Sequence, residues 1–454
     1  MVVGLIEAQC HHRVRCVTSV SGGSILNAAL AHGPSLGSFA DVEKFEPLAS
    51  TLAASLAWRG AFAFDWRSLA STGWYLARLI VRAIVPLSFG FAFLVKWLRE
   101  DLGLSMTDLS QVPWLPVGLM GAVAALVVVG LLSRGLLQEA KYQSVVSAVA
   151  ASSRGSVKPG LYVREWGAAS GDVELGVMHV LVATDLLSGE PMYFSSQFVH
   201  CRPYGWSRPE QIRTAEALYS SAAFPAVFPP KRLKLSRLNF QNGEMSGDLP
   251  RVVRLVDGGV YNNLGTDWFD VLDDQLRAAH PLLWPFGELK IDPPRIKNVI
   301  VVNASAPSRS VRRLGPLTLA RIMSVLYDNT VRPRVHTLRG GNRPLIDIDE
   351  SPSQLAERLS RETGDQGDRA KALVERLKGR TDQFWADFRA DTAGTKTKLS
   401  RAGRRTGARL MLHGYLSSLV LLHVRFGAEL PKLIRGEEYF LSLVRRPGAP
   451  TAST

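Results

Sequence analysis

A serine within a run of small residues is the first candidate for chemistry in this chain. Residues 14–18 are rich in β-branched side chains and lead into the run SVSGGS at residues 19–24, after which an apolar, helix-like stretch begins. A strand that turns sharply into a helix can present a serine hydroxyl at the turn, in a nucleophile elbow. Ser21 is the candidate nucleophile, with Gly22 and Gly23 as the small neighbours that a strained turn needs. A plain turn is the alternative.

An aspartate far downstream is the second candidate. The apolar residues Leu255 and Val256 precede Asp257, and Gly258 and Gly259 follow it. A carboxylate held at the end of a strand by a rigid turn can act as the general base for a serine hydroxyl. A structural Asx turn is the alternative for this motif. The two motifs together are much more specific than either one alone.

Two stretches between these motifs extend the pattern. They read HVLVATD at residues 179–185 and SSAAFPAVFPP at residues 220–230. With the serine and aspartate motifs, they resemble the patatin-like phospholipase family over roughly residues 1–35 and 175–305.

The resemblance implies a chemical mechanism. Members of this family use a serine and an aspartate as a catalytic dyad without histidine, so Ser21 would form the acyl-enzyme and Asp257 would be its base. The implied activity is lipid acyl hydrolysis, on phospholipids, lysophospholipids or neutral glycerides, and no cofactor is expected.

The sequence departs from the family pattern in two places. Ser19 stands where the first glycine of the elbow is usual, and residues 1–8 look like the helix that follows the glycine-rich oxyanion loop. That loop would therefore precede Met1. Losing one oxyanion donor costs about 10²- to 10³-fold in turnover. Either the start is placed too late or the chain is a degenerate copy. The alternative function is thus a catalytically impaired membrane protein that acts as a lipid-binding or assembly module.

The elements that must position Ser21 and Asp257 predict an α/β fold. Residues 177–183 and 299–302 are nearly continuous apolar runs, typical of strands buried on both faces of a sheet, and helical stretches such as 209–220 lie between them. We expect a three-layer patatin-like fold with a mainly parallel sheet. The predicted domains are a catalytic domain at residues 1–310 and a basic, mainly helical C-terminal region at residues 311–454.

Hydropathy predicts a membrane hairpin inserted at about residues 74–134. Residues 117–132 carry no charge and, with their flanks, are long enough to cross a bilayer of about 30 Å. Residues 74–98 form a second predicted span if Arg78 and Arg82 snorkel to the interface; an interfacial helix is the alternative. Two crossings would keep Ser21 and Asp257 on one side of the membrane.

Charge supports the same location. Arginine and lysine at both ends of the hairpin predict, by the positive-inside rule, an integral membrane protein whose catalytic domain faces the cytoplasm. The formal net charge of +14 favours anionic partners. Because no nucleic-acid-binding motif is present, we expect membrane lipids and the bilayer rather than nucleic acid. A general soluble esterase is disfavoured by the hairpin, and the oligomeric state is left open.

No metal site is expected. The chain has three cysteines, Cys10, Cys16 and Cys201, which are too few and too scattered for a disulfide framework or a zinc site. Residues 347–350 briefly resemble a calcium-binding loop, but Pro352 occupies the position where such a loop needs glycine.

Overall fold

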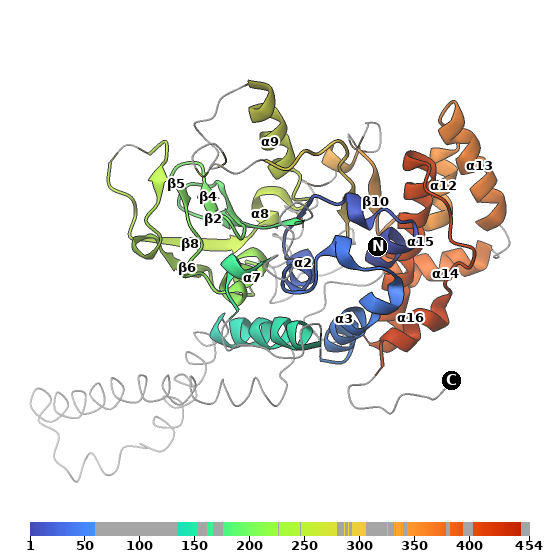
Figure 1. Cartoon of the computed structure of the whole chain (residues 1–454), viewed down its shortest axis with the longest axis horizontal. Coiled ribbons are helices and arrows are strands. Elements are labelled where there is room, and N and C mark those ends of the chain that lie inside the picture. Colours follow the sequence, from blue (N-terminus) through green and yellow to red (C-terminus); the bar gives the residue numbers. More distant parts are fainter. Residues whose placement is uncertain are drawn as a thin grey trace, which may run out of the picture. The chain divides into compact units, whose positions relative to one another are not determined.

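The computed structural model of the chain describes the following residues: 1–59, 135–152, 161–166, 176–225, 227–245, 247–278, 293–305, 343–377, 382–393, 403–445 and a few shorter pieces between 286 and 338. The chain forms two compact units, Met1–Ala63 with Tyr142–Thr454, and Phe64–Lys141. The second unit lies almost entirely outside the described residues, and the first contains the sheet and the helices around it (Figure 1).

An eight-stranded sheet organises this unit. Seven strands follow the order β6-β8-β2-β3-β4-β5-β7, and β1 pairs with β2. The strands are β1 (Cys16–Ser19), β2 (Met178–Asp185), β3 (Pro191–Phe194), β4 (Val199–Cys201), β5 (Gly205–Ser207), β6 (Lys231–Lys234), β7 (Gln241–Asn242) and β8 (Val252–Asp257). A separate parallel pair consists of β9 (Val301–Asn303) and β10 (Leu345–Asp347).

The prediction of a mainly parallel sheet is wrong. Within the eight described strands, β1 and β2 run parallel, while every other pair is antiparallel. The short connections explain the difference. Residues 186–190 join β2 to β3 and residues 195–198 join β3 to β4, whereas a parallel crossover needs a dozen residues or more. Apolar periodicity reported the burial of these strands and carried no information on their direction.

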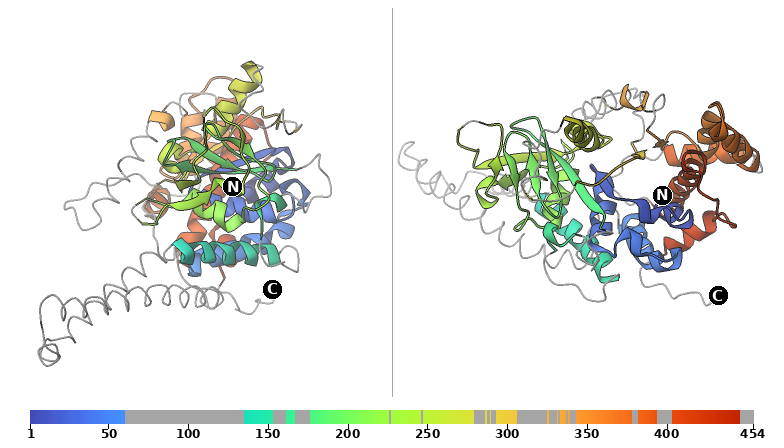
Figure 2. Two further views of the ribbon diagram at one scale, coloured as in Figure 1. Left: turned by 90° about the vertical axis from the view of Figure 1, so that its left-hand side faces the viewer. Right: turned by 45° about the horizontal axis from the view of Figure 1, so that its top comes forward.

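Helices pack around the sheet and extend from it. They are α1 (Val2–Glu7), α2 (Gly23–His32), α3 (Val42–Ala54), α7 (Thr214–Ala222), α8 (Gly259–Asn262), α9 (Asp267–Ala278), α12 (Pro352–Leu359), α13 (Asp365–Leu377), α14 (Asp382–Ala393), α15 (Arg404–Phe426) and α16 (Glu437–Leu443). In Figures 1 and 2 the N-terminal helices (blue) lie between the sheet (green) and the C-terminal helices (orange to red). The predicted domain boundary at residue 310 stays a prediction.

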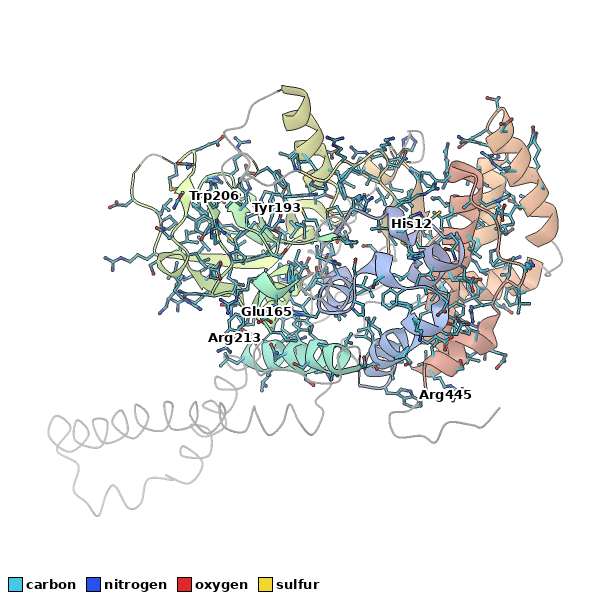
Figure 3. All side chains as sticks on the ribbon, in the orientation of Figure 1. His12, Glu165, Tyr193, Trp206, Arg213 and Arg445 are labelled. Carbon is cyan, nitrogen blue, oxygen red and sulfur yellow. The ribbon has the colours of Figure 1, made fainter. Side chains whose placement is uncertain are left out.

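Strand β2 is buried on both faces, as its apolar run indicated. Leu181 belongs to the main apolar core, whereas Val180 and Val182 belong to a smaller cluster that includes Trp268 of α9. Tyr193 of β3, labelled in Figure 3, lies in the smaller cluster with its ring centroid 5.1 Å from that of Trp268. Alternate residues of β2 therefore enter different cores, which explains the continuous run of apolar residues.

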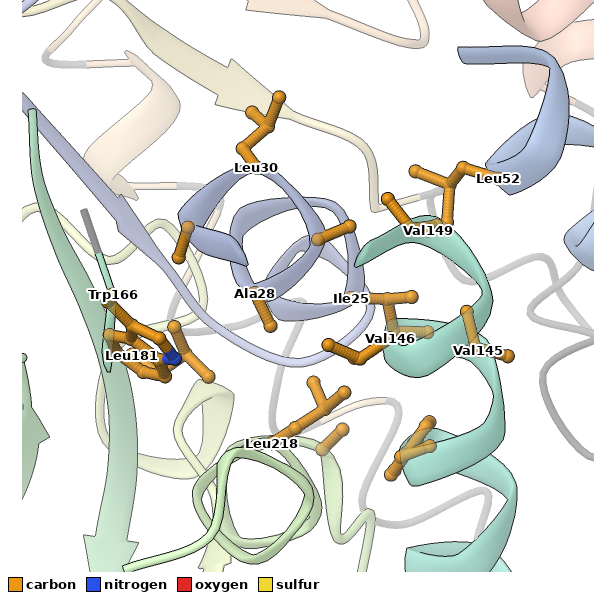
Figure 4. Close-up of a cluster of buried hydrophobic side chains, with 14 of the residues drawn as sticks. Ile25, Ala28, Leu30, Leu52, Val145, Val146, Val149, Trp166, Leu181 and Leu218 are labelled. Atoms are coloured by element: carbon orange, nitrogen blue, oxygen red, sulfur yellow. The ribbon is translucent and has the colours of Figure 1, made fainter. Parts of the chain in front are cut away.

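Helix α2 is enclosed by other elements of the main core. It packs beside β2, α3, α7 and the helical residues 142–152 (Figure 4). The buried side chains there include Ile25, Ala28, Leu30, Leu52, Val145, Val146, Val149, Leu181 and Leu218. This packing fixes the position of the helix that follows Ser21.

The described helices contradict the prediction of an integral membrane protein. None of them combines the length and the apolar character that a membrane span requires. Helix α15 is long, but it contains several arginines and packs against α1, α12 and α16. The predicted hairpin at about 74–134 lies outside the described residues. The prediction is withdrawn, together with the cytoplasmic orientation that was inferred from the hairpin.

Candidate active site

Ser21 lies at the sharp turn between β1 and α2. Its φ angle of 53° is in the left-handed region, which few residues other than glycine adopt. Its side chain is half-buried, whereas Gly22 and Gly23 are exposed. The turn therefore presents the Ser21 hydroxyl at the N-terminal end of α2, as a nucleophile elbow requires, where the helix dipole favours negative charge.

Asp257 is the last residue of β8 and is only 1 % exposed. Its Oδ1 accepts a hydrogen bond of 2.8 Å from the backbone N–H of Gly259, and its backbone carbonyl accepts one of 3.0 Å from Thr184 Oγ1. Its Oδ2 is buried and has no hydrogen-bond partner among the described residues. Asp257 therefore has one oxygen held by the turn and one oxygen available.

Two strands whose carboxyl ends face each other bring Ser21 and Asp257 together. Strand β1 runs parallel to β2 as far as Ser19, opposite Leu181, and β8 runs antiparallel to β2 and reaches Asp257 opposite Ala183. Because β3 pairs with the other edge of β2, β1 and β8 share one edge. The carboxyl ends of β1 and β8 therefore face each other, and Val182 of β2 lies between them without a partner in either strand. This break is the gap between β1 and β8, and the turn that follows each strand begins there.

Burial sets the protonation of the candidate base. It raises the pKa of Asp257 to about 6, whereas the Ser21 hydroxyl and the Gly259 N–H lower that pKa by a smaller amount. The Ser21 hydroxyl thus lies beside the carboxylate, although Oδ2 makes no hydrogen bond of regular geometry with it. A desolvated carboxylate with a raised pKa is a better base than an exposed one. This arrangement can take a proton from serine directly.

A buried polar network supports the turn that carries Ser21. Asn27 Nδ2 donates to Ser19 Oγ (2.8 Å), and Asn27 Oδ1 lies 2.7 Å from His179 Nδ1. Ser24 Oγ is 3.1 Å from Ser19 Oγ and 2.7 Å from Ser221 Oγ. Because an amide oxygen only accepts, His179 carries its proton on Nδ1. Burial lowers the pKa of His179 to about 4, so this ring is neutral at pH 7.

The network explains Ser19 and includes residues that sequence reasoning missed. The hydroxyl of Ser19, which replaces the usual glycine, is a hydrogen-bonding member of the network. The sequence motifs assign no role to Ser24 or Asn27, and they include Ser221 only as part of the stretch at residues 220–230. A polar Asn27 within an apolar helix was the one available signal, because buried polar groups require partners.

The four predicted support glycines differ in their surroundings. A Cβ at Gly22 would meet no atom within 4 Å, and one at Gly23 would meet only Ser19 Cβ at 3.8 Å. The expected crowding is absent at these two positions. At Gly258, by contrast, a Cβ would overlap the Val182 carbonyl, and at Gly259 it would lie 2.5 Å from the side chain of Asn263. Close approach of backbone therefore requires glycine at Gly258, whereas at Gly259 the nearest atom is the end of a side chain that can move, and the space beside Ser21 is open.

Comparison with known proteins agrees with the motifs. A family model described as patatin-like phospholipase matches residues 4–270, which is more than half of the chain. The matched segment contains both Ser21 and Asp257, so the predicted resemblance is confirmed, while the roles of the two residues stay predictions. A search of curated proteins found no match.

Proposed function

Since this chain belongs to the patatin-like phospholipase family, we propose that it is a serine hydrolase that cleaves carboxylic esters of lipids through an acyl-enzyme on Ser21. The family implies lipid substrates and acyl-ester hydrolysis. The observation that carries the proposal is the Ser21 hydroxyl beside the buried Asp257 carboxylate, at the gap between β1 and β8.

The first half of the reaction forms the acyl-enzyme. Ser21 Oγ attacks the ester carbonyl carbon while its proton passes to Asp257 Oδ2, the oxygen that accepts no hydrogen bond from any described residue. The carbonyl oxygen becomes an oxyanion near the N-terminal end of α2, where the backbone N–H of Gly22, an exposed residue, is the donor that we assign to it. The C–O bond to the alcohol then breaks, and the leaving oxygen takes the proton from Asp257.

The second half regenerates the enzyme. Water attacks the acyl carbon and gives a proton to Asp257, and the bond between Ser21 Oγ and the acyl carbon breaks. The proton returns to Ser21 Oγ, and the fatty acid leaves. Since a single carboxylate acts as acid and base in both halves, the mechanism requires that it stay within direct reach of Ser21.

A fluorophosphonate probe tests the proposal on the full chain. We expect covalent labelling of the wild-type protein and of Ser220→Ala, but none of Ser21→Ala. Ser220 is a matched control because it is buried and its Oγ, as far as the described residues go, bonds within its own helix, to the Glu216 carbonyl at 2.8 Å. We expect Ser21→Ala to lose about 10³-fold or more in ester hydrolysis. A folded wild-type protein that is not labelled would indicate the non-catalytic, lipid-binding alternative.

The substrate class requires a separate measurement. Release of fatty acid from a phospholipid, a lysophospholipid and a triglyceride, followed by mass spectrometry, ranks the proposed substrates. A short soluble ester provides the reference, because its hydrolysis depends on Ser21 and Asp257 with little contribution from lipid recognition. Turnover of the soluble ester without turnover of any lipid would limit the proposal to esterase chemistry.

A further inference from the structure

One backbone carbonyl holds both turns of the candidate active site. Ser221 lies near the end of α7 and is fully buried. Its carbonyl oxygen accepts a hydrogen bond of 3.0 Å from the Ser21 N–H and one of 3.2 Å from the Gly258 N–H. Gly258 follows Asp257 directly, so a single acceptor connects the backbone of the candidate nucleophile to that of the candidate base.

The hydroxyl of Ser221 fixes where that carbonyl lies. It donates a hydrogen bond of 2.7 Å to the carbonyl of Val182, the residue at the gap where β1 and β8 end. The Gly258 backbone approaches the same carbonyl closely, so this carbonyl points into the gap. There it has no strand partner from β1 or β8, and the Ser221 hydroxyl is the donor that the described residues give to this buried carbonyl. Ser24 of α2 contacts the same hydroxyl, with its Oγ 2.7 Å from Ser221 Oγ.

We propose that Ser221 is a positioning residue that sets the separation of Ser21 and Asp257 by joining α7, β2 and both active-site turns at the gap between β1 and β8. This inference rests on the proposed function. The side chain of Ser221 forms hydrogen bonds from α7 to β2 and α2, and its backbone carbonyl accepts hydrogen bonds from the two turns. Ser221 has no part in binding substrate; its effect is exerted through the two residues that it connects.

Removal of the hydroxyl should therefore reduce turnover more than substrate binding. In Ser221→Ala the carbonyl remains, but it is no longer held against β2 by the side chain. A misplacement of about 1 Å in a reacting group can cost about 10²-fold in rate. We expect kcat to fall about 10- to 100-fold, with KM changed by less than about twofold, because the groups that contact substrate are intact.

Ser220→Ala is the matched control. Both serines are buried in α7 and both substitutions delete one hydroxyl. Within the part of the chain that the structure describes, however, the Ser220 hydroxyl bonds to a carbonyl of its own helix and to no other element. We expect this variant to keep wild-type kcat and KM. Equal losses of kcat in the two variants would mean that any deletion in α7 loosens the site, and would overturn the proposal.

The experiment measures kcat and KM of the full chain on a soluble p-nitrophenyl ester, with circular dichroism to verify folding. Ser221→Ala with wild-type kcat would overturn the inference while the proposed function stands. A wild-type chain without turnover would overturn the proposed function and this inference with it. If Ser221→Ala does not fold, Ser24→Ala is compared with Ser19→Ala. Ser24→Ala removes the contacts to both Ser221 and Ser19, whereas Ser19→Ala leaves the contact between Ser24 and Ser221 in place. A lower kcat in Ser24→Ala than in Ser19→Ala, at unchanged KM, supports the role, and equal kcat in the two variants rejects it.

Discussion

The hydroxyl of Ser21 lies beside the carboxylate of Asp257, and burial outweighs this contact in setting the pKa of the carboxyl group, which is raised to about 6. Burial, the Ser21 hydroxyl and the Gly259 N–H are the influences on this pKa, and no charged side chain of the described residues contributes. The candidate base is therefore half protonated in mildly acidic solution, where an exposed aspartate would be ionised.

The pH dependence of hydrolysis should report Asp257. We expect kcat/KM for an uncharged soluble ester to rise with pH through a midpoint near 6 and then to level off, because only the ionised carboxylate accepts the serine proton. The measurement is initial rates between about pH 4.5 and pH 9. A profile that stays flat across the acidic range would argue against a carboxylate with a raised pKa as the base.

The buried carboxylate of Asp257 should lower the stability of the folded chain at neutral pH. Its pKa in the folded chain is about 6, against an ordinary value of 3.8, so the folded state binds more protons between these values and stability falls as pH rises through this window. The difference of about two in pKa corresponds to about 3 kcal/mol. We expect the free energy of unfolding of Asp257→Asn, relative to wild type, to increase by up to about 3 kcal/mol between pH 4 and pH 8.

Urea denaturation at the two pH values measures this change. Comparison across pH cancels any constant effect of the amide group on packing. The same variant should have lost hydrolysis, because an amide cannot accept the serine proton. If the variant and the wild type differ in stability by the same amount at both pH values, Asp257 does not titrate in this range.

Two glycines should respond differently to alanine. Because a Cβ at Gly258 would overlap the Val182 carbonyl, we expect Gly258→Ala to lower the free energy of unfolding by about 3 kcal/mol or more. Gly22 has helical backbone angles and no atom within 4 Å of an added Cβ, so Gly22→Ala should stay within about 1 kcal/mol of wild type. Equal effects of the two substitutions in urea denaturation would contradict the close approach at the gap between β1 and β8.

A partly buried ion pair should hold helix α1 to the C-terminal helices. Glu7 accepts a hydrogen bond of 2.5 Å from Arg435 Nε and a second one from the Tyr415 hydroxyl. The side chains of Glu7 and Arg435 are 10 % and 22 % exposed. Glu7→Ala would leave the Tyr415 hydroxyl without its acceptor and would leave Arg435 with its longer ion pairs, 3.9 Å each, to two other glutamates. We expect a loss of about 2–3 kcal/mol in the free energy of unfolding.

The control for this prediction is an exposed pair. Arg164 and Glu210 are 3.1 Å apart, with side chains 47 % and 55 % exposed, so Arg164→Ala should cost less than about 1 kcal/mol. Both variants are measured by urea denaturation at neutral pH. A cost for Glu7→Ala as small as that for Arg164→Ala would show that the network adds little to stability.

Some features could be predicted because they are local in sequence. The strand, small-residue turn and helix around Ser21 lie within about twenty residues, and their order limits the backbone to a sharp turn. The apolar run of β2 likewise indicated burial on both faces, which its alternate packing into two cores confirms. The motifs around Ser21 and Asp257 were also sufficient to identify the family.

Other features depended on contacts between distant segments. Neither the direction of β3 and β8 beside β2 nor the head-on ends of β1 and β8 can be read from periodicity, because a residue pattern has the same period in either direction. The role of Ser221 follows from hydrogen bonds to Ser21, Gly258 and Val182, which are far from it in the chain. The sequence by itself determined which side chains could do chemistry. Only the tertiary structure decided that they meet, since strand pairing and burial, which set their separation and the pKa of Asp257, arise from long-range packing.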